Sequence, residues 1–207
     1  MKQRRERWLV AVGVVVAAGM SIVSAQNPPA GAGGGRQGGG APPSFLKLTS
    51  SAFADGGMIP AKYGCGGQPV NTSPPLQWSD VPAGTLSFVL LMHDVDSHAA
   101  PGRLFDDGLH WLLWNIPATT TSLAEGVPAS AELPDGTRQF LVAGRGATPG
   151  AGFRNPCPSF VHHYVIELFA VDVKTDLPAA STRADVSKAI DGHILGHATM
   201  IGLFTRP

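Results

Sequence analysis

Three apolar runs, each six to nine residues long, constrain the fold of this chain more than any other feature of its sequence. They are nearly continuous, whereas a strand with one solvent-facing side alternates between polar and apolar residues. The runs therefore predict strands that are buried on both faces. Pro- and Gly-rich segments connect them, as expected for turns. The runs are Ser87–Met92, Trp111–Ile116 and Tyr164–Asp172, the last with Glu167 inside it.

Two further segments predict strands, and one predicts a helix. Phe45–Thr49 alternates as an opening strand does, and Thr199–Phe204 closes the chain. Thr182 stands three residues before Asp185, a variant of the capping box, and begins a helix expected over about 183–197. The sequence thus predicts a mainly β domain with one helix near the C-terminus. The apolar positions at helical spacing are Val186, Ala189, Ile190 and Ile194.

The first 25 residues have the organisation of an export signal. Met1–Arg7 is basic, Trp8–Met20 is apolar, and small residues precede a cleavage position after Ala25. The paired Arg4-Arg5 also fits a twin-arginine signal loosely, and an uncleaved anchor is a further alternative. We expect a periplasmic or secreted protein with no stable membrane span after signal cleavage.

A Gly- and Pro-rich stretch over residues 26–43 separates the signal from the rest of the chain. It has no apolar periodicity, so we interpret it as a flexible tether. Residues 44–207 have the size of one ordinary domain.

The charge balance argues against a nucleic-acid partner. The whole chain holds 15 basic and 15 acidic residues. Removal of residues 1–25 takes away four basic residues and one acidic residue, which leaves 11 basic against 14 acidic. A mildly acidic domain without a run of Lys and Arg lacks the electrostatic footprint of nucleic-acid binding.

Cys65 and Cys157 are the two cysteines of the chain, and both lie in the exported part. In an oxidising compartment such a pair favours a disulfide. The alternative is two separate buried thiols. A bridge would close a loop of roughly 90 residues, a constraint worth ~4 kcal/mol in the chain-entropy model.

Two carboxylates follow the first apolar run, in the segment His93-Asp94-Val95-Asp96. If the extended conformation continues, Asp94 and Asp96 point the same way. Close carboxylates raise each other's proton affinity and can orient a histidine. Alternatively, the two side chains cap the backbone of their own loop.

Imidazoles and a phenol stand at the beginnings of the other two runs. His110 precedes the second run, either as a donor to an anion or as a structural histidine. His162 and Tyr164 begin the third run and share a face, while His163 points away from them. We assign His163 to the surface or to packing.

The sequence lacks the common signatures of nucleotide- and ester-hydrolysing enzymes. No Gly-x-Ser-x-Gly elbow occurs, and Gly144-Arg145-Gly146 has no P-loop lysine. His193 and His197 are four apart on the expected helix, a spacing that can hold zinc. Ile194 stands where the metalloprotease motif has Glu, so we favour packing of that helix face. We expect no metal, no cofactor and no enzymatic activity.

Short motifs follow one another in register over about residues 45–204. They are Ile59–Gly67, Asn71–Trp78, Val81–Phe88, Asp94-Val95-Asp96, His110-Trp111 with Asn115–Ala118, and Pro156-Cys157-Pro158 with His162-His163-Tyr164. Together they resemble the phosphatidylethanolamine-binding protein family, in its bacterial Raf-kinase-inhibitor-like branch. The resemblance implies a central antiparallel β-sheet packed on a smaller one, with a few peripheral helices, one near the C-terminus.

The resemblance also implies a small cavity that takes phosphate-like anions and phospholipid head groups. Val95 stands where the family usually has Pro, and Asn155 where it usually has Gly, which affects the rim of the cavity and its selectivity. Carried over position by position, the pocket residues are Asp94, Asp96, His110, Pro156, His162 and Tyr164.

We therefore expect an exported protein that binds a small anion or a phospholipid head group. The histidines and Tyr164 can donate to an anion, whereas Asp94 and Asp96 repel one unless they are protonated or paired. Binding should then be weak and strengthen as the pH falls through the histidine range. Two alternatives are an inhibitor or scaffold that acts on a protein partner, such as a protease, through the pocket rim, and a hydrolase or metal enzyme.

Overall fold

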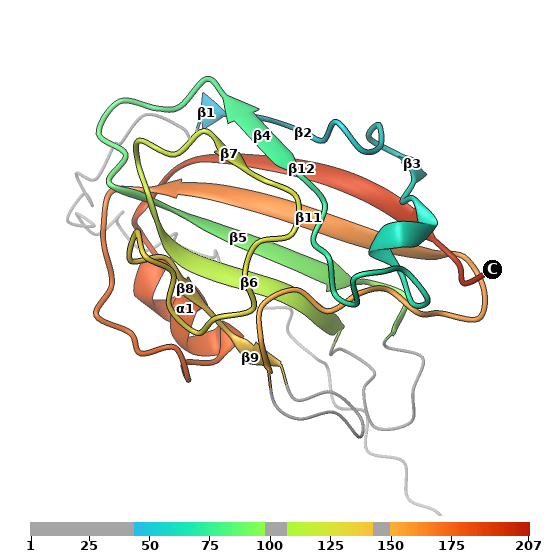
Figure 1. The fold of residues 1–207 in the computed structure, drawn as a ribbon. Helices are drawn as coiled ribbons and strands as arrows, with labels where there is room; N and C mark the ends of the chain where they lie inside the picture. The colour runs from blue at the N-terminus through green and yellow to red at the C-terminus, as the bar shows by residue number, and fades with distance from the viewer. Residues whose placement is uncertain (1–43, 98–106, 143–149) are drawn as a thin grey trace, which may run out of the picture. The chain divides into compact units, whose positions relative to one another are not determined.

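A seven-stranded sheet forms the centre of the structure, a computed structural model that describes residues 44–97, 107–142 and 150–207. The strand order is β1-β12-β11-β5-β6-β8, with β3 also paired to β12 (Figure 1). Neighbours from β12 to β8 are antiparallel, whereas β1 and β3 lie parallel to β12. The strands are β1 Ser44–Phe45, β3 Gly57–Met58, β5 Ser87–Asp94, β6 Gly108–Pro117, β8 Arg138–Gln139, β11 His162–Val171 and β12 Ile194–Phe204. The expected signal and tether lie outside the described residues.

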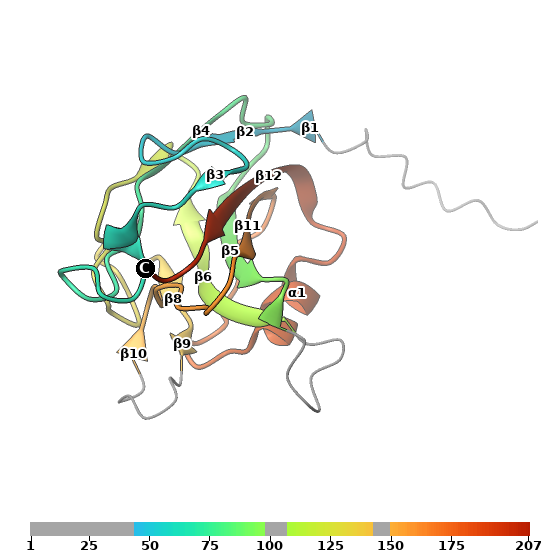
Figure 2. The same cartoon turned by 90° about the vertical axis from the view of Figure 1, so that its right-hand side faces the viewer.

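A smaller antiparallel sheet covers one face of the large sheet, and the helix α1 (Arg183–Ile190) covers part of the other (Figure 2). The smaller sheet has the order β2-β4-β7, with β2 Lys47–Thr49, β4 Leu76–Ser79 and β7 Ser122–Leu123. A two-stranded sheet joins β9 (Leu141–Val142) to β10 (Gly150–Ala151), and a short 3-10 helix spans Ala61–Tyr63. This arrangement confirms the expected mainly β fold of two packed sheets with a helix near the C-terminus.

The large sheet is buried on both faces, as the apolar runs predict. Every residue of β5 is buried. Phe88 and Met92 belong to the core beneath the smaller sheet, and Leu91 belongs to a second core beneath α1. Because successive side chains of a strand point to opposite faces, a strand between two cores must be apolar throughout.

The expected opening strand over Phe45–Thr49 divides between the two sheets. β1 pairs with β12 in the large sheet, and β2 pairs with β4 in the smaller sheet. Leu46 lies at the change of partner and is buried in the core between the sheets. Alternation of apolar residues predicts the extended conformation but does not specify the partner.

The predicted helix over 183–197 is wrong in its C-terminal half. The capping box of Thr182 and Asp185 is confirmed, but the helix ends at Ile190. Gly192 adopts a φ of 80°, and Ile194 begins β12. Ile194 fits the helical period of Val186 and Ile190, yet the full-length pairing of β12 with β11 determines its conformation. No helix in the described residues is long and apolar enough to cross a membrane.

Candidate functional site

The ends of three central strands, β5, β6 and β11, lie next to one another in the large sheet. β5 runs antiparallel to both β6 and β11, so its last residue meets the first residues of both neighbours. Asp94 is paired with Gly108 on one side and Tyr164 on the other. The sheet therefore brings together acids and histidines that are 16 or more residues apart in the sequence.

A β-bulge turns His110 toward this cluster. Met92 is paired with Trp111 and the next residue, His93, with Leu109, so His110 is the extra residue of β6. Its buried ring meets Tyr164 edge to face, with centroids 5.0 Å apart. A bulge commonly changes the direction of a side chain in this way. The sequence pattern gives no indication of this bulge.

Asp94 holds the ring of His162. The carboxylate is 4% exposed, and its Oδ2 accepts a hydrogen bond from His162 Nδ1 at 2.8 Å. Its Oδ1 accepts from the backbone N–H of Asp96 at 3.0 Å. With the Nδ1 proton directed at Asp94, His162 can donate from Nε2 only as the imidazolium. Asp94 thereby orients His162 and offsets its charge.

His110 is held as a neutral ring by the loop before Pro156. Its Nδ1 donates to the carbonyl oxygen of Arg154 at 2.8 Å, and its Nε2 accepts from Arg154 Nη2 at 3.3 Å. Burial, with help from the positive charge of Arg154, lowers the pKa of His110 to about 4. In this tautomer His110 supplies no donor to an anion, which corrects the donor role expected for it.

Tyr164 and Arg154 are the other donor side chains of the cluster, and the Tyr164 hydroxyl is hydrogen-bonded to Asp94. Burial, and then the negative charge of Asp94, raise the pKa of Tyr164 well above its usual range, so the hydroxyl keeps its proton. Arg154 is the cation that the sequence reasoning missed. Its position directly before Asn155-Pro156 was the available signal, because a stiff loop next to a pocket fixes its neighbours.

Asp96 does not share the orientation of Asp94, because β5 ends at Asp94 and the chain turns. Asp96 Oδ2 accepts from the backbone N–H of His163 at 2.6 Å and from its Nδ1 at 2.8 Å. Slight burial acts to raise the pKa of Asp96, but these hydrogen bonds lower it overall. His163 points away from His162, as expected, and pairs with Asp96 at the surface.

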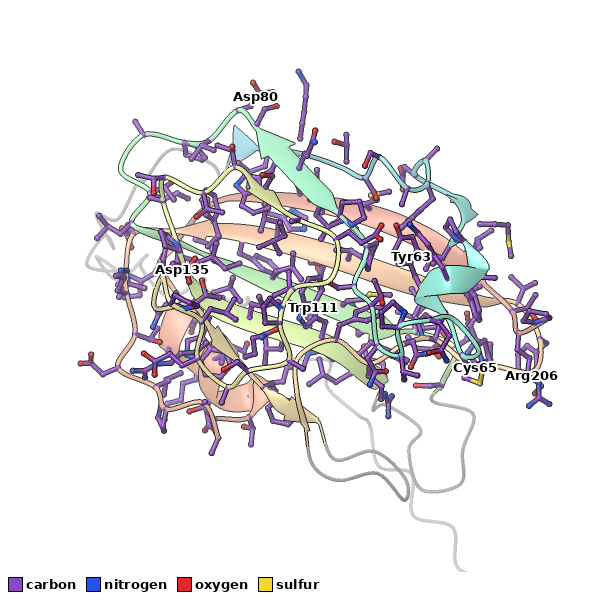
Figure 3. The ribbon with its side chains drawn as sticks, in the orientation of Figure 1. Tyr63, Cys65, Asp80, Trp111, Asp135 and Arg206 are labelled. Atoms are coloured by element: carbon purple, nitrogen blue, oxygen red, sulfur yellow. A yellow bond between two sulfur atoms is a disulfide. The ribbon has the colours of Figure 1, made fainter. Side chains whose placement is uncertain are left out.

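Two loops are joined beside the cluster. The Cys65–Cys157 disulfide is present, with Cα atoms 5.1 Å apart. The carbonyl oxygen of the buried Pro156 accepts from the backbone N–H of Cys65 at 2.7 Å. Figure 3 shows Cys65, Tyr63 and Arg206 toward the same end of the molecule. Pro156 therefore stiffens the wall of the site and supplies no donor, since it has no N–H.

The comparisons with known proteins identify the family to which this fold belongs. A model of the phosphatidylethanolamine-binding protein family matches residues 49–205. The chain belongs to this family. Among its relatives, a UPF0098 protein of Methanothermobacter thermautotrophicus is 41% identical over 162 residues, which cover 78% of this chain and 99% of that protein. A UPF0098 protein of Aquifex aeolicus is 37% identical and covers 79% of this chain and 90% of that protein.

Two solved structures place the chain in the bacterial branch of the family. The homologue CT736 of Chlamydia trachomatis has a TM-score of 0.65 at 33% identity, and covers 79% of this chain and 99% of its own. YbcL of E. coli has a TM-score of 0.62 at 26% identity, and covers 79% of this chain and 100% of its own.

Both departures from the family pattern have a local explanation. The backbone N–H of Val95 donates to the carbonyl oxygen of His163 at 3.2 Å, a hydrogen bond that the family's proline cannot make. Asn155 Nδ2 donates to the carbonyl oxygen of Gly64 at 2.8 Å, so its side chain adds a tie between the joined loops. A glycine at this position has no side chain to make that bond.

The two-histidine zinc arrangement does not form. His193 lies between α1 and β12, and His197 lies within β12, so the helical spacing is lost. His193 Nδ1 donates to Asp172 at 2.7 Å, and His197 stacks near Phe169. Within residues 44–97, 107–142 and 150–207, no group of three or more His, Cys, Asp or Glu side chains is placed to hold a metal.

Proposed function

We propose that the cluster of Asp94, His162, Tyr164 and Arg154 binds a phosphate-like anion, either free or as a phospholipid head group. The observation that carries the proposal is the Asp94–His162 pair beside a hydroxyl and a guanidinium. Asp94 already accepts two hydrogen bonds, so its charge opposes an anion less than a free carboxylate does. Tyr164 and Arg154 donate at all physiological pH values.

The pH dependence of binding should come from His162. His110 stays neutral until the pH approaches its lowered pKa of about 4. His162 gains a donor at Nε2 when it is protonated, because Asp94 holds its Nδ1–H. Anion affinity is therefore expected to rise as the pH falls from 7.5 to 5.5.

Calorimetric titration at pH 5.5 and 7.5 tests this proposal. Sulfate is the better probe for the pH effect, because its charge is constant over this range, and phosphate and O-phosphoethanolamine compare a free anion with a head group. We expect several-fold tighter sulfate binding at pH 5.5, lost in His162→Gln. The exposed His193 beside Asp172 gives a matched control, His193→Gln, at the far end of β11. Equal sulfate affinities at both pH values contradict the role of His162.

We further propose that the site binds without turnover. Arg154 occupies both ring nitrogens of the neutral His110, so this ring is not available as a general base, and the sequence has no common hydrolase signature. A screen of ester and phosphoester substrates checks this. Turnover that disappears in His110→Ala would establish a hydrolase instead.

Export to an oxidising compartment is proposed from the N-terminal sequence and the disulfide. Cell fractionation, with sequencing of the N-terminus, should find the protein outside the cytoplasm and beginning near Gln26. A reduced protein in the cytoplasm contradicts export.

The rim favours a protein partner as a second candidate function. Phe160 is 61% exposed, and its ring lies 4.5 Å from that of His162. An exposed aromatic side chain at a site mouth is a common anchor for a partner. A pull-down of an envelope protease that is lost in both Phe160→Asp and His110→Ala supports this role. Capture unaffected by either change excludes it.

A further inference from the structure

A cavity of about 550 Å³ lies on the face of the large sheet opposite the proposed anion site. Its floor includes Leu91, Phe169 and Ile194, and its wall is α1. Leu91 belongs to the core beneath α1, whereas the Asp94 side of the sheet faces the smaller sheet. The volume falls within the range of about 300–1,000 Å³ that is typical of small-molecule sites.

The cavity exists because α1 is too short to cover the sheet. Eight helical residues span about 12 Å, whereas the ten residues of β11 span about 33 Å. The helix is anchored by Val186 and Ile190, which are its buried residues. Its cavity-lining positions also include Ala184 and Ser187, whose small side chains leave the space beside the anchor unfilled.

The floor of this cavity contains one carboxylate among apolar side chains. Glu167 lies within β11 between buried neighbours, and its side chain is 23% exposed. His93 Nε2 lies 3.3 Å from Glu167 Oε2, and this contact is the first cause of the lowered pKa of Glu167. His197 Nε2 lies 3.8 Å from the other oxygen. A carboxylate has about four acceptor sites, so these two contacts leave Glu167 with acceptor capacity for a ligand.

The charges around the cavity favour a cation. Arg183 is bonded to Asp107, which also contacts His93 Nδ1. Lys188 is exposed and interacts with Asp185 on its own helix. Each permanent cation therefore has its own carboxylate. The lining holds two acidic residues, Glu167 and Asp191, beside Arg183 and Lys188, and His93 and His197 lie against Glu167.

We propose that this cavity binds a compact apolar amine. Its aryl or alkyl body packs on Leu91, Phe169 and Ile194, and its ammonium group pairs with Glu167. The inference is independent of the anion site, which lies on the other face of the sheet and uses other residues. It also adds a ligand-binding role to Glu167, which already contacts His93.

Three probes of the same shape and different charge test the proposal: 2-phenylethylamine, 2-phenylethanol and phenylacetate. Each is titrated into the purified full-length protein at pH 7 and followed by amide chemical shifts in NMR spectra. We expect the amine to bind about tenfold more tightly than the alcohol, since a charge-assisted hydrogen bond is stronger than a neutral one and part of this gain is lost to solvent. Phenylacetate should show no measurable binding.

Variants separate the body of the ligand from its charge. Glu167→Gln should lower the amine affinity to that of the alcohol. Ala184→Trp should fill the cavity and abolish both, while Ala180→Trp, on an exposed position outside the lining, should change neither. Sulfate binding at the other face should be the same in all three variants, so the two proposals fail separately. Equal affinity for the amine and phenylacetate, or amine binding retained in Ala184→Trp, overturns the inference.

Discussion

The buried neutral ring of His110 should make the protein lose stability as the solution becomes mildly acidic. The ring is 5% exposed, and its pKa is lowered from 6.5 to about 4, chiefly by burial and then by the charge of Arg154. Asp94 opposes this effect without reversing it. As the pH falls below 6.5, His110 becomes protonated in the unfolded chain but stays neutral in the folded protein. Unfolding therefore becomes more favourable.

The size of this loss follows from the pKa difference. A difference of about 2.5 units, at 1.36 kcal/mol per unit, corresponds to about 3 kcal/mol. The loss begins near pH 6.5 and is complete near pH 4, where the folded protein also binds the proton. The raised pKa of His93 acts in the opposite direction. It is present in both wild type and a His110 variant, so it cancels when the two are compared.

Urea denaturation at pH 7, 6, 5 and 4 measures this loss against His110→Asn. Asparagine can keep the hydrogen bond to the Arg154 carbonyl but does not titrate. Between pH 7 and 4 the wild type should lose about 3 kcal/mol more than the variant. Ile116→Val is a matched control in the same strand, with a cost of about 1 kcal/mol that does not depend on pH. A stability difference between wild type and His110→Asn that stays constant with pH refutes the reasoning.

Three other changes should lower the free energy of unfolding by amounts that denaturant curves can resolve. Replacing both Cys65 and Cys157 by Ala should cost ~4 kcal/mol, since the bridge spans 92 residues, and a loss below 1 kcal/mol contradicts the loop-closure argument. Thr182→Ala removes the capping box of α1 and should cost about 1 kcal/mol. Gln139→Met leaves the indole N–H of the buried Trp111 without its partner at 2.9 Å and should cost about 1–3 kcal/mol; no change would mean that water replaces the bond.

The sequence predicts the central strands because strands that are buried on both faces consist almost entirely of apolar residues. β5 and β6 lie between two cores, so their residues are apolar on both faces. The prediction is less certain where one residue fits both the helical period and the strand period. Ile194 matches both the helical spacing of Val186 and the strand that follows it, and pairing with β11 decides between them. Long-range pairing of this kind is not visible in a local pattern.

The candidate site is predicted as a set of residues but not as a geometry. Asp94, His162 and Tyr164 stand at strand ends, and antiparallel pairing brings such ends together. The orientation of His110 depends on one extra residue in β6, which the local sequence does not announce. Arg154 was missed for a related reason, since its role follows from contact with that reoriented ring.

The segment that begins with His93-Asp94 shows why adjacency in sequence misleads about a site. Successive side chains of β5 point to opposite faces, so the two residues join different networks. Asp94 pairs with His162 on the side of the smaller sheet, and His93 lies between Asp107 and Glu167 on the side of α1. Glu167 interrupts an apolar strand because it meets His93 there. His162 and Glu167 both belong to β11 and are five residues apart, so their side chains lie on opposite faces of the sheet. The pairing of β5 with β11 therefore forms two sites with separate chemistry.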